Sequence, residues 1–265
     1  MLRNVFTKTL WDDRWSLLWW AVGVTAMVFL YVSPYQTYLG DGALDLQMDG
    51  VAMDTRLFET LGIEIALPAG YLGATVFGPI GALPLIIAMT VAGARMIAGD
   101  EEVGLVGLLL AGPVSRTSFV GQRFAALTVR TTALGGVLLV SSIAAVAIDG
   151  PEMGVGRLAV ATVGLTLLAL AFGTLALAVG AATGRHGLAI GLTGLVAATT
   201  YLANTLASQA DSLEPLRWLT PFYHYEHQNL LRSGLDPAWL TLQVCVPLGL
   251  LVFSIWTFNR RDVSM

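Results

Sequence analysis

The residues best suited to chemistry gather in one short stretch, PFYHYEHQN, which holds His224, Glu226 and His227. Imidazole nitrogens and a carboxylate are common zinc ligands, so a metal site is the first possibility. However, His-x-x-His is not the His-Glu-x-x-His spacing of metalloproteases, and no third ligand is evident nearby in the sequence. Aromatic and polar residues also make up the belt where membrane proteins meet water. We therefore expect an interfacial segment here and no metal.

A second stretch has the glycine spacing of a phosphate-binding loop, from Gly73 to Gly78. Such a loop needs Lys-Ser/Thr directly after its last glycine, because the lysine reaches the outer phosphates. Here Pro79 follows instead, and the only lysine of the chain is Lys8. The chain is therefore not a P-loop ATPase, and we expect it to hold no cofactor of its own.

The composition identifies the surroundings in which these residues lie. The 265 residues are 55% hydrophobic and 12% charged, whereas a soluble globular domain carries about 25% charged residues. Six apolar runs are long enough to form the roughly 20-residue helix that crosses a bilayer. We predict an all-α integral membrane protein whose six transmembrane helices cover residues 16–32, 74–98, 127–148, 158–183, 188–206 and 240–258.

The predicted spans hold no ionisable side chain near their middle. Arg95, Arg130 and Arg185 all fall within a turn or two of one boundary, where a long side chain can reach the headgroups. Intramembrane enzymes and ion-driven transporters depend on polar or charged groups inside the hydrocarbon. Both classes are therefore disfavoured, although an intramembrane enzyme stays a minor alternative.

The positions of the basic residues indicate the orientation. An even number of spans puts both termini on one side, and short cytoplasmic segments accumulate Lys and Arg. With cytoplasmic termini, ten of the 14 basic residues are cytoplasmic: Arg3, Lys8, Arg14, Arg95, Arg116, Arg123, Arg130, Arg185, Arg260 and Arg261. Only four are external, namely Arg56, Arg157, Arg217 and Arg232. We predict that both termini are cytoplasmic.

The N-terminal segment, the acidic segment after the first span, and the small residues and prolines of the spans lead to further predictions. Residues 1–15 place Leu2, Val5, Phe6 and Leu10 on one helical stripe, which suits an inner interfacial helix, although a polar leader fits equally well. The acidic segment 33–73 is external, as a solvated loop or with a surface helix in MDTRLFETLGIEI. Small residues four apart, as in Gly187-Leu-Ala-Ile-Gly191 and GTLALAVGAATG, predict close helix packing. Pro79 and Pro84 should bend the second span.

One apolar run, residues 103–111, is too short to cross. Asp100, Glu101 and Glu102 before it match the start of a helix, because acids stabilise the positive end of the dipole. Nine residues extend only about 14 Å at 1.5 Å per residue. Gly112-Pro113 should end this helix, and Ser115 should cap a second one that leads through Arg123 into the third span. A short apolar helix at the inner membrane surface can contact a partner or pack beneath its own bundle.

The stretch resembles the cytoplasmic coupling region of ABC type-2 exporter permeases, whose pattern reads approximately Glu-Glu-x-Gly-Thr-Leu-Asp/Glu-Leu-Leu-Leu-Ala-x-Pro-Val-Ser-Arg. Leu105 stands where threonine is usual, Gly107 where an acid is usual and Gly112 where a polar residue is common. Four further segments resemble segments of the family and occur in the same order along the chain. They are FTKTLWDDRWSLLWW, LPAGYLGATVF, LTPFYHYEHQNLLRSGLD and the ending WTFNRRDVSM. The matching residues are Glu101, Glu102, Gly104, Leu108, Leu109, Leu110, Ala111, Pro113, Val114, Ser115 and Arg116.

The resemblance implies a single permease domain over residues 1–265, in the plasma membrane of a prokaryote. Its parts are an inner interfacial helix (1–15), a cytoplasmic coupling helix region (99–120) and an external segment with short helices before the last span (207–237). Its partners would be two ATP-binding subunits, which hold ATP and Mg, and a second permease copy or close relative. No nucleic-acid partner is expected. The cargo would be a hydrophobic or amphiphilic drug, antibiotic or lipid.

The resemblance also assigns roles to residues. Glu101 and Glu102 would cap and orient the coupling helix, which includes Gly104. Leu108 and Leu109 would enter the groove of the ATPase. The turn from Pro113 through Ser115 to Arg116 would lead the chain back to the membrane. The substrate path would be lined by the first, second and fifth spans, with Trp19, Trp20, Phe29, Tyr201 and Asn204 as candidates. A membrane scaffold or sensor that recruits an ATPase without transport is the main alternative.

Overall fold

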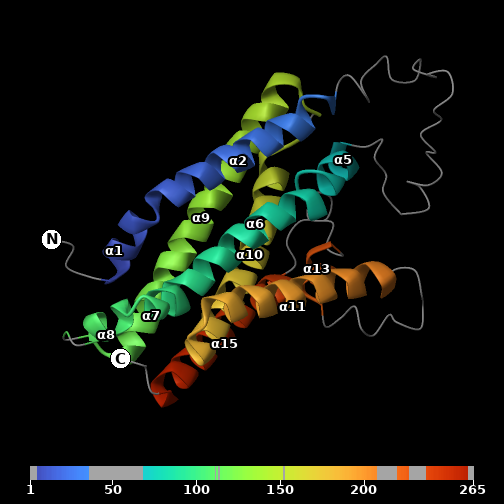
Figure 1. Cartoon of the computed structure of the whole chain (residues 1–265). Helices are drawn as coiled ribbons and strands as arrows, with labels where there is room; N and C mark the ends of the chain where they lie inside the picture. The colour runs from blue at the N-terminus through green and yellow to red at the C-terminus, as the bar shows by residue number, and fades with distance from the viewer. Residues whose placement is uncertain are drawn as a thin grey trace, which may run out of the picture.

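The computed structural model describes residues 5–35, 68–110, 112, 114–151, 153–207, 220–226 and 237–261. In these ranges the regular structure is helical, and six helices are long and apolar enough to cross a membrane (Figure 1). The predicted fold class, an all-α integral membrane protein, is confirmed. The long helices are α2 (Arg14–Val32), α6 (Pro79–Ala94), α9 (Arg116–Asp149), α10 (Val155–Thr183), α11 (His186–Ala207) and α15 (Pro237–Arg260).

The shorter helices flank these spans. They are α1 (Val5–Asp12), α5 (Pro68–Ala74), the π-helix η1 (Arg95–Gly99), α7 (Asp100–Glu102), α8 (Leu105–Leu110) and α13 (Pro221–Glu226). The helical structure is interrupted between α5 and α6, so Pro79 is the first residue of α6. The missing N–H of a proline costs nothing at that position. Helix α6 continues through Pro84. The interruption of the second span therefore lies before Pro79.

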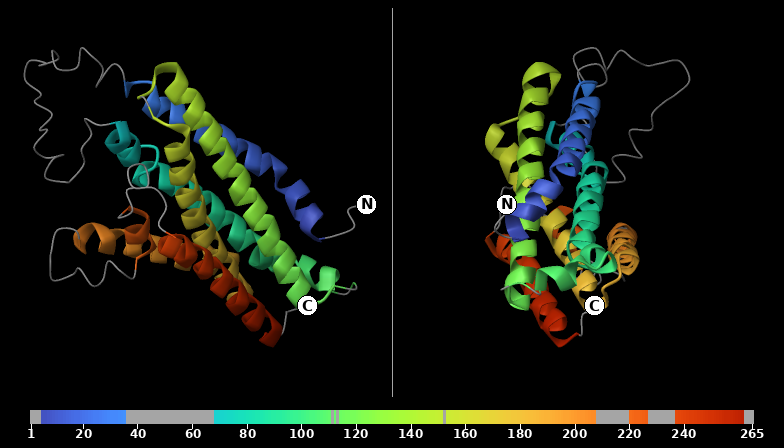
Figure 2. Two further views of the ribbon diagram at one scale, coloured as in Figure 1. Left: turned by 180° about the vertical axis from the view of Figure 1, so that it is seen from behind. Right: turned by 60° about the vertical axis from the view of Figure 1, so that its left-hand side comes forward.

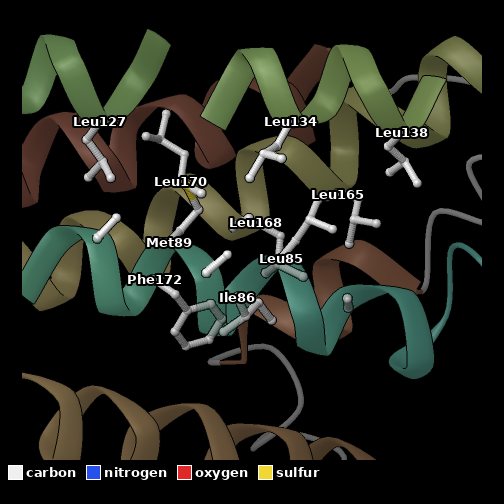
Figure 3. Close-up of a cluster of buried hydrophobic side chains, with 14 of the residues drawn as sticks. Leu85, Ile86, Met89, Leu127, Leu134, Leu138, Leu165, Leu168, Leu170 and Phe172 are labelled. Atoms are coloured by element: carbon white, nitrogen blue, oxygen red, sulfur yellow. The ribbon is translucent and has the colours of Figure 1, made fainter. Parts of the chain in front are cut away.

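Helix α10 forms the centre of the bundle and packs against α6, α9, α11 and α15. In the most apolar 18-residue stretch of α10, 72% of the residues are buried inside the protein. The corresponding share is 17% for α2, 11% for α11 and 17% for α15. Leucines from α9 and α10 meet residues of α6 in the core, where Leu134, Leu168 and Leu85 point toward one another (Figure 3). The outer spans thus leave most of their apolar surface to lipid or to another protein.

Small residues allow the closest contact, between α6 and α10. A Cβ atom added at Gly93 would overlap the backbone oxygen of Gly173, so only glycine lets the two backbones approach this closely. The prediction of close packing in the fourth span is therefore confirmed. By contrast, a Cβ at Gly187 or Gly191 of α11 would meet nothing within 4 Å in the described part of the chain. Among the described residues, these two glycines therefore serve no helix packing.

Both described ends of the chain lie at one end of the bundle. Helix α1, helices α7 and α8, and the C-terminal end of α15 gather there, as two opposite views show (Figures 1 and 2). The backbone N–H of Phe6 donates to Gln122 Oε1 of α9, which ties α1 to the bundle. The grouping agrees with an even number of crossings. That this end is cytoplasmic, and that α1 lies in the interface, stay predictions.

The segment before the last span contains α13. Its Phe222 ring packs against Phe172 of α10 and Tyr201 of α11, with ring centroids 5.6 Å and 5.5 Å apart. The hydroxyl of Tyr225 donates to the carbonyl of Phe77, which precedes α6 at the end of the bundle away from α8. The stretch MDTRLFETLGIEI lies outside the described residues.

Candidate functional site

The stretch from Gly99 to Phe119 contains two helix ends and two helix starts. The second span continues from α6 through η1 into α7, so Asp100, Glu101 and Glu102 end a helix instead of starting one. The chain turns at Val103 and Gly104, and α8 begins only at Leu105. The prediction of a helix starting at Asp100 with these acids as its caps was wrong. The predicted short apolar helix is present as α8, which the structure describes from Leu105 to Leu110 and which begins at Leu105 instead of Asp100.

The turn before α8 depends on Gly104. Its φ is +74°, a left-handed conformation that costs a residue with a Cβ about 1–2 kcal/mol. The N–H of Gly104 donates to the carbonyl of Glu101 at 2.9 Å, which closes the turn. The turn at Gly104 therefore lets α8 run in a different direction from the second span.

The three acids bind three different elements of the chain. Asp100 forms an ion pair with Arg123 of α9, and Glu101 forms one with Arg261, directly after α15. Glu102 Oε1 accepts a hydrogen bond from the N–H of His186 at 2.8 Å. His186 is the first residue of α11, where a carboxylate satisfies an unpaired amide and is stabilised by the helix dipole. Glu102 thus stabilises the start of α11.

Ser115 and Arg116 fix the start of the third span. The N–H of Ser118 donates to Ser115 Oγ at 3.2 Å, so the predicted cap of the second helix is confirmed. Arg116 Nη1 donates to the carbonyls of Phe258, at 3.3 Å, and Arg261, at 2.7 Å. These carbonyls lie at the C-terminal end of α15, where a cation satisfies free acceptors. The turn therefore joins α9 to the end of α15.

The surface of the segment differs from the predicted contact set. Val103 is 68% exposed, whereas Val106 is fully buried and Leu109 packs partly against the core of its own chain. Leu108 lies on α8, but its side chain and the whole of Pro113 lie outside the described residues. Val103 is therefore an exposed apolar residue that the sequence did not single out, because its exposure depends on the turn at Gly104.

The comparisons with known proteins assign this architecture. The family described as ABC-2 family transporter protein matches residues 3–263. The chain belongs to this family. No curated protein matches the sequence.

An ABC-2 protein is the transmembrane permease subunit of an ABC transporter and works with a separate ATP-binding subunit. The resemblance read from the sequence is therefore confirmed. The missing phosphate-binding loop agrees with this division of labour, because ATP hydrolysis belongs to the partner. The stretch around α8 resembles the family's coupling segment in sequence, and its role in contacting the ATP-binding subunit remains a prediction.

The five candidate path residues of this ABC-2 permease lie on two separate helices. Trp19, Trp20 and Phe29 belong to α2, which packs on α9, whereas Tyr201 and Asn204 belong to α11, which packs on α10 and α6. Trp19 is exposed, Trp20 is partly buried and Asn204 is buried. The structure of the single chain does not bring the five side chains into one cavity.

An apolar groove of about 530 Å³ lies between α2 and α9. Phe29 contributes to its wall, together with Thr25, Ala133, Gly136, Val137, Val140, Ser141 and Ala144. A Cβ added at Gly136 would meet no described residue within 4 Å, so the groove is open there. Of the candidate path residues, only Phe29 lines this groove.

The histidine stretch begins in helix α13. His224 and Glu226 belong to α13, but their side chains and His227 lie outside the described residues. Among the residues that the structure describes, no group of three or more His, Cys, Asp or Glu side chains could hold a metal ion.

Proposed function

We propose that this ABC-2 protein is the permease of an ATP-driven exporter that moves a hydrophobic or amphiphilic molecule outward. Its ATP-binding subunits hold ATP and Mg and dock at the end of the bundle formed by α1, α7, α8 and the end of α15. The single observation that carries the proposal is the short helix α8, which lies beyond the spans and directly follows Glu101 and Glu102, whose contacts reach the end of α15 and the start of α11.

Val103 is the best-supported contact for an ATP-binding subunit. It is 68% exposed, it lies at the turn that precedes α8, and the acids beside it are engaged with their own chain. Docking through an apolar side chain also fits Leu105 and Gly107, which occupy positions where the family usually has polar residues. Leu109 is less available, because part of its surface already packs on the core.

The permease works as a pair, with a second copy or a close relative, and the pair binds two ATP-binding subunits. The open surface of α11 supports this arrangement, because Gly187, Gly191 and Gly194 have no neighbour within 4 Å of a built Cβ in the described chain. The exposed Trp19 of α2 belongs to a second face that the described part of the chain leaves uncovered. A path between two permeases, lined by α2, α6 and α11, would bring the separated candidates Trp19, Trp20, Phe29, Tyr201 and Asn204 together.

The apolar lining of the α2–α9 groove and the uncharged spans support an apolar or amphiphilic cargo, such as a drug, antibiotic or lipid. The excess of basic residues at the end that carries α8 supports cytoplasmic termini in a prokaryotic plasma membrane. In that orientation α8 faces the compartment that contains ATP.

The docking role is tested by replacing Val103 with Asp and measuring the affinity of the co-expressed ATP-binding subunit for the permease. Burying a valine contributes about 1.5–3 kcal/mol, so the charged variant should bind at least about tenfold more weakly. Val155→Asp is the matched control, because Val155 is exposed at the start of α10, at the opposite end of the bundle. Equal affinities for Val103→Asp and the wild type would show that the ATP-binding subunit docks elsewhere.

A further inference from the structure

The acids at the end of the second span form a junction between helices of this chain. Consecutive residues of a helix point about 100° apart, so three in a row radiate toward three different neighbours. Asp100 reaches α9 through Arg123, Glu101 reaches the end of α15 through Arg261, and Glu102 reaches the start of α11 through the N–H of His186. A single turn of helix thus contacts three other spans.

Burial makes two of these contacts hard to break. The side chain of Glu101 is 6% exposed, and that of its partner Arg261 is 22% exposed. Arg123 is 7% exposed opposite Asp100. Removing one member would leave a buried charge without its counter-ion, which costs far more than losing an exposed pair. Glu102 is exposed, so its contact contributes less.

A second layer of contacts extends the junction. Arg123 Nη1 also donates to Thr9 Oγ1 of α1 at 2.8 Å. The rings of Phe119 and Phe258 stack with centroids 5.7 Å apart, which holds α9 against α15 beside the Arg116 hydrogen bonds. The π-helix η1 directly precedes the acids, and its longer hydrogen-bonded turn rotates them relative to α6.

The position of the junction relates it to α8. Only Val103 and Gly104 separate Glu102 from the first residue of α8. Asp100 and Glu101 are bonded within the chain and have little surface left for another protein. A force applied to α8 therefore reaches the acids first, and through them α9, α11 and α15.

We propose that Asp100, Glu101 and Glu102 are positioning residues that transmit a displacement of α8 to α9, α11 and α15 together, and that Asp100 and Glu101 do so without contacting the ATP-binding subunit themselves. The transmission part of this proposal rests on the proposed function, whereas the junction itself belongs to the single chain.

The junction is tested on the isolated full-length chain in lipid nanodiscs by backbone hydrogen exchange. Glu101→Gln should raise exchange over residues 257–261 by about tenfold or more, because the end of α15 loses its anchor. The charge exchange Glu101→Arg with Arg261→Glu should restore slow exchange. Asp12→Asn is the control, since Asp12 is an exposed acid at the same end of the bundle, and it should change nothing there. Unchanged exchange in Glu101→Gln would overturn the junction.

Transmission is tested in the complex with the ATP-binding subunit and a non-hydrolysable ATP analogue. In the wild type, the analogue should change exchange in α8 and also at the end of α15. In Glu101→Gln the change should remain in α8 and disappear at α15, with affinity for the ATP-binding subunit kept within about twofold, because the buried carboxylate is no part of an interface hot spot. The charge exchange should restore the response.

Two results would overturn the transmission role. One is a loss of affinity for the ATP-binding subunit in Glu101→Gln that the charge exchange does not repair, since that would make Glu101 a direct contact. The other is an unchanged response at α15. A wild-type chain that binds no ATP-binding subunit would contradict the proposed function, while the exchange experiment on the isolated chain would still decide the junction.

Discussion

Replacing Gly184 with Ala should perturb the junction without mutating either member of its central ion pair. Gly184 follows α10 with φ +66°, and a Cβ there would lie 2.8 Å from Glu101 Oε1 and would overlap the Arg261 guanidinium. The left-handed backbone costs alanine about 1–2 kcal/mol. Displacing Arg261 from a carboxylate that is 6% exposed adds about 1–3 kcal/mol. Gly184→Ala should therefore lower the free energy of unfolding by about 2–5 kcal/mol.

Gly104→Ala is the matched control for this prediction. Its φ is +74°, but a Cβ there would meet nothing within 4 Å in the described chain, so only the backbone cost of about 1–2 kcal/mol applies. Both variants can be compared by unfolding the purified chain with increasing SDS in mixed micelles while following circular dichroism. The difference between them measures the displaced ion pair. Equal losses of stability would refute the assignment of Glu101 and Arg261 as a stabilising pair beside Gly184.

Three other predictions concern the bundle and its orientation. Arg130 donates to Asp13 Oδ2 at 2.6 Å and to Ser16 Oγ at 3.0 Å, so Arg130→Met should lower the free energy of unfolding by about 1–3 kcal/mol. Asp13→Asn should recover part of that loss in the double variant, and strictly additive effects would contradict the pairing. Gly93→Ala should cost about 1–3 kcal/mol by forcing α6 from α10, whereas Gly23→Ala, with open space around it, should be neutral or stabilising in the same assay. With Cys245, the only cysteine, changed to Ser, a cysteine replacing the exposed Ser118 should react with a membrane-impermeant thiol reagent from the cytoplasmic side alone. Labelling from outside would reverse the orientation.

The spans could be predicted from the sequence because hydrocarbon thickness alone determines the length of an apolar run. Each predicted run overlaps a long helix, although the second run also includes the break before Pro79. The cap at Ser115 follows a local rule that needs no distant partner. Close packing was harder to predict. Gly173 and Gly187 both occur in small-residue patterns, yet only Gly173 meets a neighbouring backbone, because the position of each helix in the bundle decides which face is covered.

The acids show where local rules failed. Asp100, Glu101 and Glu102 match the signal for a helix start, but in the structure their partners lie 23, 160 and 84 residues away along the chain. Contacts between distant segments outweighed the local preference, so the acids end a helix instead. The exposure of Val103 could not be predicted either, because it depends on the direction in which Gly104 turns the chain.

The most direct measurement is ATP-driven movement of a fluorescent phospholipid by the permease and its ATP-binding subunit, reconstituted together in sealed vesicles. The account predicts that the lipid moves to the leaflet opposite the ATP-binding subunits, that it stimulates ATP hydrolysis, and that Val103→Asp lowers both activities. ATP hydrolysis by an assembled complex with no movement of the lipid or of other amphiphiles would contradict export and would support a scaffold or sensor that recruits the ATPase.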